Sequence, residues 1–402
     1  MKILVINAGS SSLKYQLIDM KDNSRLAIGI CERIGTSGRF KHTTSDGRVY
    51  DAQIPMPNHN VAFHQMLDTL LKGEYSVISD ISEINAIGHR IVNGGEKFSK
   101  SVLVDDQVLK DFGEVINFAP LHNPPAMVCI DACLEMFDSK VPNVLVFDTA
   151  FHQTMPPKAY LFGVEYKYYE KYKVRRYGAH GTSHRYVGNR CAEIMNKDIK
   201  DLKIVTCHIG NGSSLAAIKN GVCIDTSMGF TPLAGVMMGT RSGTIDPSVV
   251  TFLMDKENLS PSEMEDMLNK RSGLLGISGI SSDSRDLEAA IAKDDAKMAH
   301  LALGVMNYQI KSYVGAYVAA MNGIDALVFT AGIGENSDRT RRQVCEDMDY
   351  LGIKIDDKVN RSHIRDTELE ITAPGARVRT FIIPTNEELM IALDTKRIVE
   401  SL

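Results

Sequence analysis

The sequence predicts an α/β protein made of two duplicated domains that face each other. Three observations lead to this prediction. The chain has 402 residues, a length that is typical of two or three domains. Its first nineteen residues have the pattern of a β-hairpin with a Gly/Ser-rich turn, and a similar pattern returns about two hundred residues later. Internal similarity at half the chain length is typical of a domain duplication.

The first pattern starts with a β-branched and apolar run, Lys2 to Ile6, which predicts a strand. Residues 7–12 read Asn-Ala-Gly-Ser-Ser-Ser and residues 14–19 alternate in polarity, which predicts a tight turn and a second strand. The backbone N–H groups, the serine hydroxyls and the Lys14 ammonium can bind an anion there. The amide oxygen of Asn7 is a ligand that Mg²⁺ accepts directly or through water. The alternative is a surface hairpin with a polar turn.

The second pattern begins with the strand-like residues 202–208 and ends with a second apolar run after residue 215. Between them, the letters Asn-Gly-Ser-Ser-Leu of residues 211–215 echo Gly-Ser-Ser-Ser-Leu of residues 9–13. Two such turns, one in each domain, can bind one nucleotide polyphosphate from both sides. The alternative is a chance match of small residues.

The composition argues against several classes of protein. With 44% hydrophobic and 24% charged residues the chain is typical of a soluble globular protein. Its net charge of −5 gives no reason to expect binding to nucleic acid or to an anionic membrane. A strand follows directly after Met1, so we expect no signal peptide, and no uncharged apolar run reaches the ~20 residues of a transmembrane helix.

The seven scattered cysteines are typical of reduced thiols in the cytoplasm. Cys129 and Cys133 lie one helical turn apart, which is a possible start of a metal site. No further ligand is close in the sequence, and this favours burial as small apolar side chains.

The first domain continues with strand-like and polar residues 27–54, which predict further strands and an exposed hairpin. Residues 60–71 have the apolar period of a helix. Residues 84–87 predict a strand that leads to Arg90. An Arg at a strand end can direct its planar guanidinium to a carboxylate or a phosphoryl group. The alternative is an exposed surface Arg.

The end of the first domain holds an acidic candidate. The Pro-rich residues 120–125 predict the start of a helix over residues 126–137. Residues 143–147 then predict a buried strand, with Asp148 at its carboxyl end, a position that often faces a cleft in α/β folds. The alternative is an Asp that caps a loop. The tyrosine-rich residues 160–172 predict an interface or a junction between lobes, because the chain has no basic stripe.

The second domain has a candidate histidine and a candidate arginine. His180 and His184 lie at the start of a predicted helix over residues 185–195. A zinc site formed by the two histidines is one alternative, but the sequence has no acidic third ligand at the right spacing. An imidazole N–H that faces a phosphoryl group is favoured instead. Residues 225–247 are rich in Gly, Pro and hydroxyl groups and predict a long loop of the kind that carries function. Arg241 lies inside it; the alternative is a solvated surface Arg.

The remaining residues predict alternating helices and strands. Residues 261–271 predict a helix, residues 273–282 a flexible Gly/Ser segment, and Asp283 the cap of another helix. A long helix over residues 301–321 is expected to pack under a buried strand, residues 326–330. A Gly-x-Gly turn follows, which alone is a weak signal. A last helix, with Glu387 at its start, is expected to end near residue 398.

The sequence resembles a known family, the acetate kinases. Residues 7–14 (Asn-Ala-Gly-Ser-Ser-Ser-Leu-Lys) are similar to the family's N-terminal signature, and residues 177–184 (Tyr-Gly-Ala-His-Gly-Thr-Ser-His) to its second signature. The resemblance runs through the whole chain. It implies two ribonuclease-H-like lobes of the acetate and sugar kinase/Hsp70/actin superfamily, with an active-site cleft between the lobes. The implied lobes are residues 1–150 plus 384–402, and residues 151–383.

The resemblance implies a reversible, Mg²⁺-dependent transfer of the γ-phosphoryl group of ATP to acetate, which gives acetyl phosphate and ADP by direct in-line attack. Mn²⁺ is an implied substitute for Mg²⁺. The implied protein is a cytoplasmic homodimer with no nucleic-acid or membrane partner. One alternative is a propionate or other short-chain acyl kinase, since Ala179 stands where some family members carry a bulkier aromatic. Another is a nucleotide-switched protein of the actin or Hsp70 type.

The resemblance also implies roles for single residues. The implied catalytic residues are Arg90, Asp148, His180 and Arg241; the implied acyl-substrate contacts are Arg90, Val92, Leu121 and Pro232; and the implied Mg²⁺ ligands are Asn7 and Glu387. The implied nucleotide contacts are Ser10, Ser12, Lys14, His208, Ile209, Gly210, Asn211, Gly212, Asp283, Ser284, Arg285, Ala331, Gly332, Ile333, Gly334, Glu335 and Asn336. The family role of Asp148 is proton transfer. Because acetate is already ionised at pH 7, an Asp that organises Mg²⁺ or an Arg is the simpler role.

Overall fold

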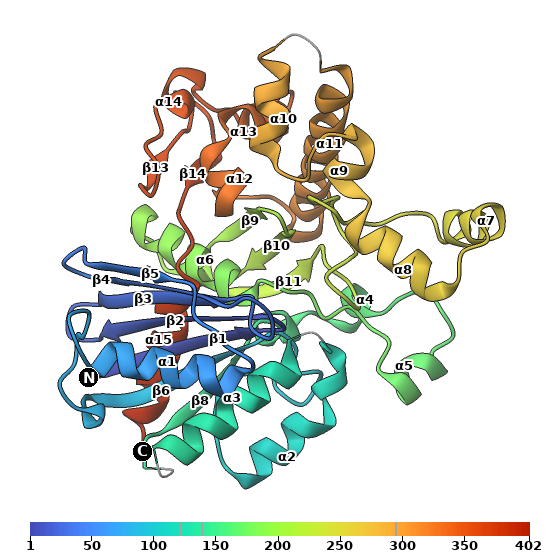
Figure 1. Ribbon diagram of the computed structural model, residues 1–402. Coiled ribbons are helices and arrows are strands. Elements are labelled where there is room, and N and C mark those ends of the chain that lie inside the picture. The colour runs from blue at the N-terminus through green and yellow to red at the C-terminus, as the bar shows by residue number, and fades with distance from the viewer. Residues whose placement is uncertain (121, 138–139, 294–295) are drawn as a thin grey trace. The chain divides into compact units, whose positions relative to one another are not determined.

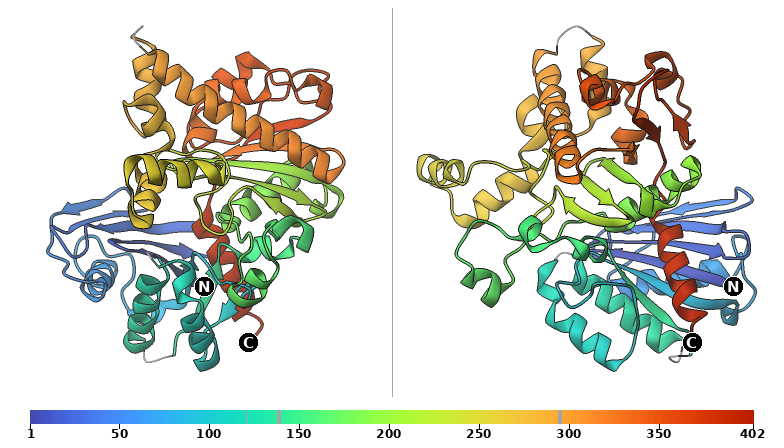
Figure 2. Two further views of the ribbon diagram at one scale, coloured as in Figure 1. Left: turned by 90° about the vertical axis from the view of Figure 1, so that its right-hand side faces the viewer. Right: turned by 180° about the vertical axis from the view of Figure 1, so that it is seen from behind.

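The computed structural model describes residues 1–120, 122–137, 140–293 and 296–402. The chain divides into two compact units, residues 1–153 with 386–402 and residues 154–385 (Figure 1). The last helix, α15 (Glu387–Val399), therefore belongs to the first unit, and Figure 2 shows it in red against the blue strands of that unit.

The first unit is built on one sheet with the strand order β5-β4-β3-β2-β1-β6-β8-β7. An antiparallel meander is formed by β1 (Lys2–Gly9), β2 (Ser12–Asp19), β3 (Ser24–Glu32), β4 (Arg39–Thr44) and β5 (Val49–Ala52). The strands β6 (Ile84–Ile91) and β8 (Asn143–Phe147) continue the sheet parallel to β1, and β7 (Val102–Leu103) pairs antiparallel with β8. The predicted first hairpin is confirmed, with Ser10 and Ser11 as its turn.

The alternation of side chains along β1 decides which helices cover each face of this sheet. Ile3 and Val5 pack with α15, whereas Leu4 and Ile6 on the opposite face pack in the core that contains α1 (His59–Leu71) and α3 (Asn123–Met136). A third helix, α2 (Asp106–Glu114), contributes Phe112 to the core over β8. Helix α3 starts a few residues before the predicted position 126, because prolines fit the first helical turn.

The second unit repeats this plan. Its sheet has the order β11-β10-β9-β12-β14-β13, built from β9 (Lys203–Ile209), β10 (Ser213–Lys219), β11 (Val222–Thr226), β12 (Ala326–Thr330), β13 (Leu369–Glu370) and β14 (Arg379–Ile382). Three antiparallel strands come first, and two strands then continue parallel to β9. The order β3-β2-β1-β6-β8 of the first unit thus returns as β11-β10-β9-β12-β14, which confirms the predicted duplication.

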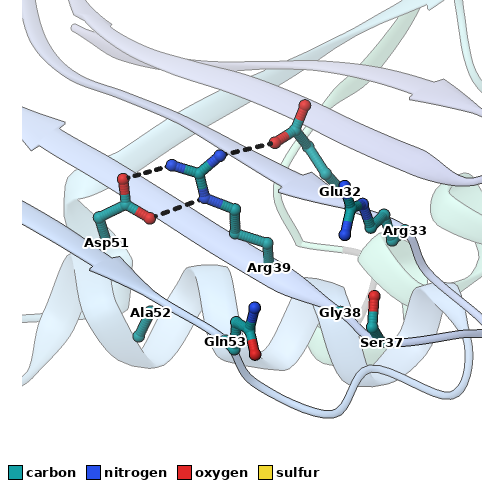
Figure 3. A pocket seen from close by; sticks show the side chains of 8 residues that line it. All are labelled: Glu32, Arg33, Ser37, Gly38, Arg39, Asp51, Ala52 and Gln53. Atoms are coloured by element: carbon teal, nitrogen blue, oxygen red, sulfur yellow. Dashed lines mark hydrogen bonds and ion pairs between the residues drawn. The ribbon is translucent and has the colours of Figure 1, made fainter.

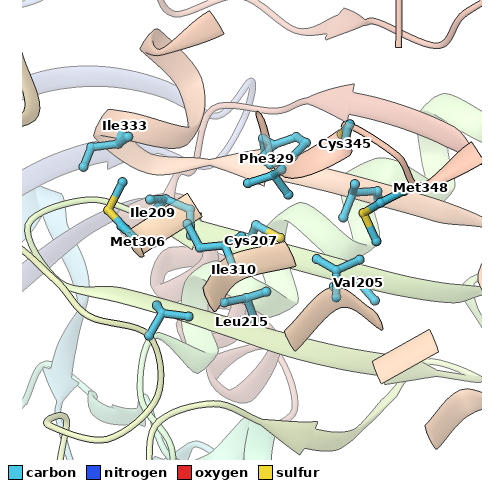
Figure 4. Packing of buried hydrophobic residues seen from close by; sticks show 14 of the residues in the cluster. Val205, Cys207, Ile209, Leu215, Met306, Ile310, Phe329, Ile333, Cys345 and Met348 are labelled. Atoms are coloured by element: carbon cyan, nitrogen blue, oxygen red, sulfur yellow. The ribbon is translucent and has the colours of Figure 1, made fainter. Parts of the chain in front are cut away.

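Helices cover both faces of the second sheet. On one face, Met306 and Ile310 of α11 (Lys297–Met321) lie in the same apolar core as Cys207 of β9 and Phe329 of β12 (Figure 4). On the other face lies α6 (Gly181–Met195), where Gly188 allows close approach: a Cβ on Gly188 would lie 2.8 Å from the Cδ1 of Ile218. Burial of apolar surface on both faces is what stabilises the sheet.

The other helices of the second unit lie along its connections. They are α4 (Pro157–Tyr160), α5 (Lys167–Tyr172), α7 (Pro247–Glu257), α8 (Pro261–Lys270), α9 (Gly273–Ser278), α10 (Ser284–Ile291), α12 (Ala331–Asn336), α13 (Asp338–Cys345) and α14 (Asp357–Arg361). Helix α9 shows that the prediction of a flexible segment from residue 273 was wrong. Leu274 is fully buried in the core, and burial of this side chain orders a segment whose glycines alone favour flexibility. The predicted Gly-x-Gly turn is likewise part of a helix, α12.

Each of the seven cysteines lies in the described part of the chain, and each is buried as a free thiol. Burial raises the pKa of Cys129 to about 12. Among the described residues, no three His, Cys, Asp or Glu side chains are grouped as metal ligands. No helix in this part of the chain combines the length and apolar character needed to cross a membrane.

Candidate active site

In the first unit, an arginine, an amide and two acids gather where parallel strands end. Arg90 lies in β6 near its carboxyl end, beside Asn7 of β1, and Asp148 directly follows β8. The Nε and Nη2 of Arg90 donate to Oδ2 of Asp148 over 3.2 and 2.6 Å, and its Nη1 donates to Oδ1 of Asn7 over 3.4 Å. Oε2 of Glu387, from the start of α15, lies 3.8 Å from Nε of Arg90.

This cluster keeps Arg90 charged although little of its side chain, 19%, is exposed. Burial opposes the charge, but Asp148 and Glu387 hold the pKa of Arg90 above its usual value. The Asp148 side chain is itself 1% exposed, and the adjacent Arg90 guanidinium compensates the charge of its carboxylate. The sequence left open whether Asp148 holds an arginine; in the structure its carboxylate pairs with Arg90.

The negative charge of the Glu387 carboxylate is only partly compensated. Burial raises its pKa to about 7, because the lowering influence of Arg90 is countered by Asp148 and Glu388. The position at the first residue of α15 is fixed by Asn386, whose side chain accepts a hydrogen bond from the N–H of Leu389.

Replacing Glu387 by Gln is expected to stabilise the metal-free protein at pH 8 and to change little at pH 5. The pKa of Glu387 is about 7 in the folded protein against a reference of 4.5. The stability that protonated Glu387 contributes is therefore fully present below pH 4.5 and is lost as the pH rises through about 7. A shift of this size corresponds to about 3 kcal/mol. Thermal unfolding in EDTA at both pH values measures the effect.

The exposed Glu400, at the opposite end of α15, supplies the control. Its replacement by Gln should leave the difference between the two pH values close to that of the wild type. A Glu387→Gln protein with the same melting-temperature change at pH 5 and at pH 8 would contradict the assignment.

The residues of this cluster fit a magnesium ion. The carboxylates of Glu387 and Asp148 and the amide oxygen of Asn7 are the oxygen ligands that Mg²⁺ prefers. Arg90 supplies one positive charge against the carboxylates of Asp148 and Glu387, and burial together with the negative charge of Asp148 raises the pKa of Glu387. A divalent cation beside Glu387 would supply the missing charge.

In the second unit, a polar network lies between α6 and the hairpin of β9 and β10. His180 is the N-cap of α6, with a left-handed backbone (φ 56°), and its Nδ1 lies 2.8 Å from Oγ of Ser214. Ser214 also contacts Nε2 of His184 over 2.8 Å, and Nδ1 of His184 lies 2.7 Å from Oγ1 of Thr206. Because both ring nitrogens of His184 are engaged in this way, the pair of His180 and His184 is built as a hydrogen-bonded network rather than a zinc site.

His208 continues the network from β9. Its ring stacks on that of His180, with centroids 4.1 Å apart, and its Nδ1 lies 2.8 Å from Oγ of Ser183. The rings of two predicted site residues, one from α6 and one from β9, therefore lie face to face.

Arg241 reaches the turn of the second hairpin. A Cβ on Gly212 would lie 3.5 Å from Nη1 of Arg241 and 3.5 Å from Nε2 of His180, so these two side chains flank the glycine turn. Burial lowers the pKa of Arg241, and no carboxylate of the described residues adds to or opposes this effect. A partly buried guanidinium that pairs with no acid of the described residues, beside a glycine turn, can bind an anion there.

Backbone contacts fix the loop that carries Arg241. The N–H of Gly239 donates to the carbonyl of Asn211 over 3.2 Å, which ties the loop to the second hairpin. The N–H of Ser272 donates to the carbonyl of Thr240 over 2.9 Å, which ties it to the segment before α9. Residues 227–246 form no helix or strand, and the buried Val236 and Met237 anchor this loop in the apolar core of the second unit.

A pocket of about 760 Å³ in the second unit collects residues from four segments that are far apart in the sequence. It is lined by predicted nucleotide contacts from the second hairpin, α10 and α12, namely Gly210, Asn211, Asp283, Ser284, Arg285, Gly332, Ile333 and Asn336. Ser282, Glu288, Ser337 and Arg365 complete the lining and were missed by the sequence reasoning. The place of Glu288 in the pocket could have been predicted, since it lies one helical turn after Ser284 on α10. No sequence signal predicted Arg365, because only the tertiary fold brings it to the pocket.

A model of the Acetokinase family matches residues 2–393. The chain belongs to the acetokinase family. The acetate kinase of Clostridium acetobutylicum is 55% identical over 402 residues, and that of Thermotoga maritima is 55% identical over 404 residues; in both cases 100% of each chain is covered.

Solved structures of the acetokinase family and its neighbours agree in fold. The crystal structure of Porphyromonas gingivalis acetate kinase has a TM-score of 0.95 and 47% identity, and the match covers 99% of each chain. A propionate kinase from Francisella tularensis subsp. tularensis has a TM-score of 0.89 and 38% identity, covering 98% of this chain and 99% of that one. These similarities confirm the predicted two-lobed α/β fold.

Not every residue that the acetokinase resemblance implied lies in a pocket. The side chain of Ile209 and the residues Ala331, Gly334 and Glu335 are buried. The Glu335 carboxylate accepts hydrogen bonds from the N–H groups of Ala331, over 2.7 Å, and Thr385, over 3.2 Å. Glu335 therefore holds the backbone around the pocket and does not line it.

The remaining residues implied by the family fall in several places. In the first unit, Ser10 is exposed at the turn of the first hairpin, Ser12 and Val92 are partly exposed, and Lys14 lines a pocket of about 430 Å³ with Glu388. In the second unit, the carbonyl of Pro232 accepts a hydrogen bond from Nη1 of Arg241 over 3.2 Å. Leu121 lies outside the described residues.

A further hollow of about 490 Å³ in the first unit contains none of the family's implied residues. Arg39 donates to both carboxylate oxygens of Asp51, over 2.9 and 2.7 Å, and lies 3.9 Å from Oε2 of Glu32 (Figure 3). These charges neutralise one another at an exposed site, and we assign this hollow no ligand.

Proposed function

We propose that this protein is an ATP-dependent acetate kinase, which transfers the γ-phosphoryl group of ATP to acetate and forms acetyl phosphate and ADP reversibly. The observation that carries this proposal is the flanking of the second glycine turn by His180 and Arg241, beside a pocket that collects the predicted nucleotide segments. Full-length similarity to acetate kinases supports it.

The pocket of the second unit is proposed to bind the adenosine part of ATP. Its walls offer glycine backbone at Gly332, hydroxyls at Ser282 and Ser284, and charged side chains at Arg285 and Glu288. The N–H of Gly210 donates to the carbonyl of Gly212 within the turn, and the N–H groups of Asn211 and Gly212 suit the phosphates. We propose that Ser10, Ser12 and Lys14 of the first hairpin contact phosphate as well, and that His208 acts by supporting His180.

Replacing Gly239 by Ala is expected to raise the KM for ATP about tenfold, which corresponds to ~1.4 kcal/mol. A Cβ at this position would lie 2.2 Å from Oδ1 of Asn211 and 3.0 Å from the carbonyl of Ser282, so both lining residues must move. Steady-state kinetics with varied ATP measures the effect.

The matched control is Gly304→Ala in α11, where a Cβ meets nothing within 4 Å. This variant should keep the wild-type KM and gain a little stability, because Ala has the higher helix propensity. Equal KM values for ATP in both variants would show that Gly239 does not position the pocket.

The proposed phosphoryl transfer depends on positioning and on charge neutralisation rather than on a general base. Phosphoryl transfer needs little covalent help from the protein, and the carboxylate of acetate is already ionised at pH 7. We propose that Arg241 and His180 neutralise the transferred phosphoryl group and that Arg90 contacts acetate and this group. Asp148 keeps the guanidinium of Arg90 in place. Val92, Leu121 and Pro232 are the proposed surroundings of the acetate methyl.

Magnesium is proposed to bind at Asn7 and Glu387, partly through water, with Mn²⁺ as a substitute. When bound, it neutralises charge on the phosphate oxygens. We also propose that the protein is a cytoplasmic homodimer without nucleic-acid or membrane partners. The exposed tyrosines of the α5 region support an interface, since Tyr166 and Tyr172 have 57% and 53% of their surface exposed.

Acetate is the proposed substrate in preference to propionate. Ala179 is small, but it is buried with Met228 and Met238, which pack around it. The space that a smaller residue leaves is therefore filled by methionine side chains. Values of kcat/KM for acetate, propionate and butyrate test this preference, and acetate is expected to give the highest.

Trapping with hydroxylamine tests the function itself. The protein, ATP, MgCl₂ and acetate should yield acethydroxamate from acetyl phosphate, in an amount that matches the ADP formed. Slow ATP hydrolysis at a rate that acetate does not change would instead favour a nucleotide-switched protein and would overturn the proposal.

A further inference from the structure

Thr385 occupies a special place in the chain. It is the last residue of the second unit, and the chain passes into the first unit at Asn386. Glu387, the proposed magnesium ligand at the start of α15, follows two residues after it. Two residues span at most ~7 Å of extended chain. Whatever fixes Thr385 therefore limits where Glu387 can lie.

Two elements of the proposed nucleotide site hold Thr385. Its N–H donates to Oε1 of Glu335 over 3.2 Å, and the same carboxylate oxygen accepts from the N–H of Ala331, over 2.7 Å, where β12 meets α12. Its hydroxyl lies 2.7 Å from Oγ of Ser183, which in turn contacts Nδ1 of His208 over 2.8 Å.

The partners of Thr385 are themselves fixed. Ser183 is fully buried, and Glu335 and His208 are each 8% exposed. The His208 ring is stacked on His180, and Glu335 lies in α12, which contributes Gly332, Ile333 and Asn336 to the pocket. A buried, fully engaged network of this kind holds a single geometry more firmly than isolated hydrogen bonds do.

We propose that Thr385 is a positioning residue, which connects the phosphate and adenosine elements of the second unit to the first turn of α15 and so sets the place of Glu387. This inference rests on the proposed function. Nucleotide in the pocket and magnesium at Glu387 are then linked through one hydroxyl and one N–H group.

The test is Thr385→Val, which keeps the side-chain shape and removes the hydroxyl. We expect kcat to fall about tenfold and the Mg²⁺ concentration for half-maximal rate to rise severalfold, because small displacements of a positioned ligand cost rate. ADP affinity in EDTA, measured by fluorescence of a labelled ADP, should stay within about twofold of wild type, as the pocket residues are untouched. Thr385→Ser, which restores the hydroxyl, should recover most of both losses.

Thr380→Val is the matched control. Thr380 lies on β14 and is fully buried, and its hydroxyl has no hydrogen-bond partner among the described residues. The same substitution there should leave kcat and the Mg²⁺ dependence unchanged. Ser183→Ala removes the other hydroxyl of the contact with Thr385 and should raise the Mg²⁺ requirement in the same way. This second variant keeps the proposal testable if Thr385→Val does not fold.

The proposal is overturned if Thr385→Val and Ser183→Ala both keep the wild-type Mg²⁺ dependence. It is equally overturned if Thr385→Val lowers ADP affinity in EDTA as much as it lowers kcat, since that result indicates general structural damage. A wild-type protein that yields no acethydroxamate would overturn the proposed function instead, so the two failures are distinguishable.

Discussion

Replacing Arg241 by Ala is expected to lower kcat about 10²–10³-fold while the KM for ATP stays nearly the same. The guanidinium lies beside the glycine turn at Gly212 and next to His180, and no carboxylate of the described residues offsets its charge. Its charge is therefore available to a phosphoryl group as negative charge shifts during transfer. Arg241 does not line the pocket that is proposed to bind adenosine, so the affinity for ATP should be retained. Steady-state kinetics in both reaction directions measures the effect.

A surface arginine of the same unit gives the control. Arg361 is 63% exposed at its side chain and pairs loosely with Asp357, so Arg361→Ala should keep the wild-type kcat. Full turnover by Arg241→Ala would remove Arg241 from the proposed mechanism.

Replacing Arg90 by Ala is expected to lower kcat/KM for acetate about 10³-fold and to destabilise the fold by about 3–5 kcal/mol. The stability loss arises because the buried carboxylate of Asp148 loses its counter-charge. Arg90→Lys should not restore activity, since a single ammonium cannot replace the Nε and Nη2 contacts to Asp148 and the Nη1 contact to Asn7. Kinetics with varied acetate, together with urea unfolding, separates the two effects.

Asp148→Asn distinguishes an organiser from a base. If Asp148 organises the site, the variant should have a lower kcat with an unchanged pH profile. The reason is that the attacking carboxylate, that of acetate, needs no deprotonation. Loss of a titration from that profile in Asp148→Asn would favour proton transfer and contradict the organising role.

Local sequence signals predicted much of the fold correctly. The strand-turn-strand pattern at residues 2–19 and its echo at residues 202–219 gave two hairpins at the expected places, because strand alternation and turn residues are short-range properties. The turns differ in detail: Ser10 and Ser11 connect the first pair, whereas residues 210–212 connect the second. The flexible segment expected from residue 273 failed, because burial of Leu274 outweighs local glycine content.

The site shows where sequence reasoning ends. Arg90 and Asp148 were both expected at strand ends, and only the sheet order, which places β6 beside β8, makes them partners. Glu335 was expected at the nucleotide from its motif, yet its carboxylate turns inward to the N–H groups of Ala331 and Thr385. A motif fixes residue types along the chain but not the direction of each side chain.

The sequence by itself determined the duplication, the family and the residue types of the site, because these depend on the order of residues along the chain. The tertiary structure alone decided which residues contact each other across long separations. It placed Glu288 and Arg365 in the pocket, and it joined Thr385 to Ser183 and Glu335. The physical reason is that hydrogen bonds and burial depend on distances in space, which are set only when the sheets and helices pack.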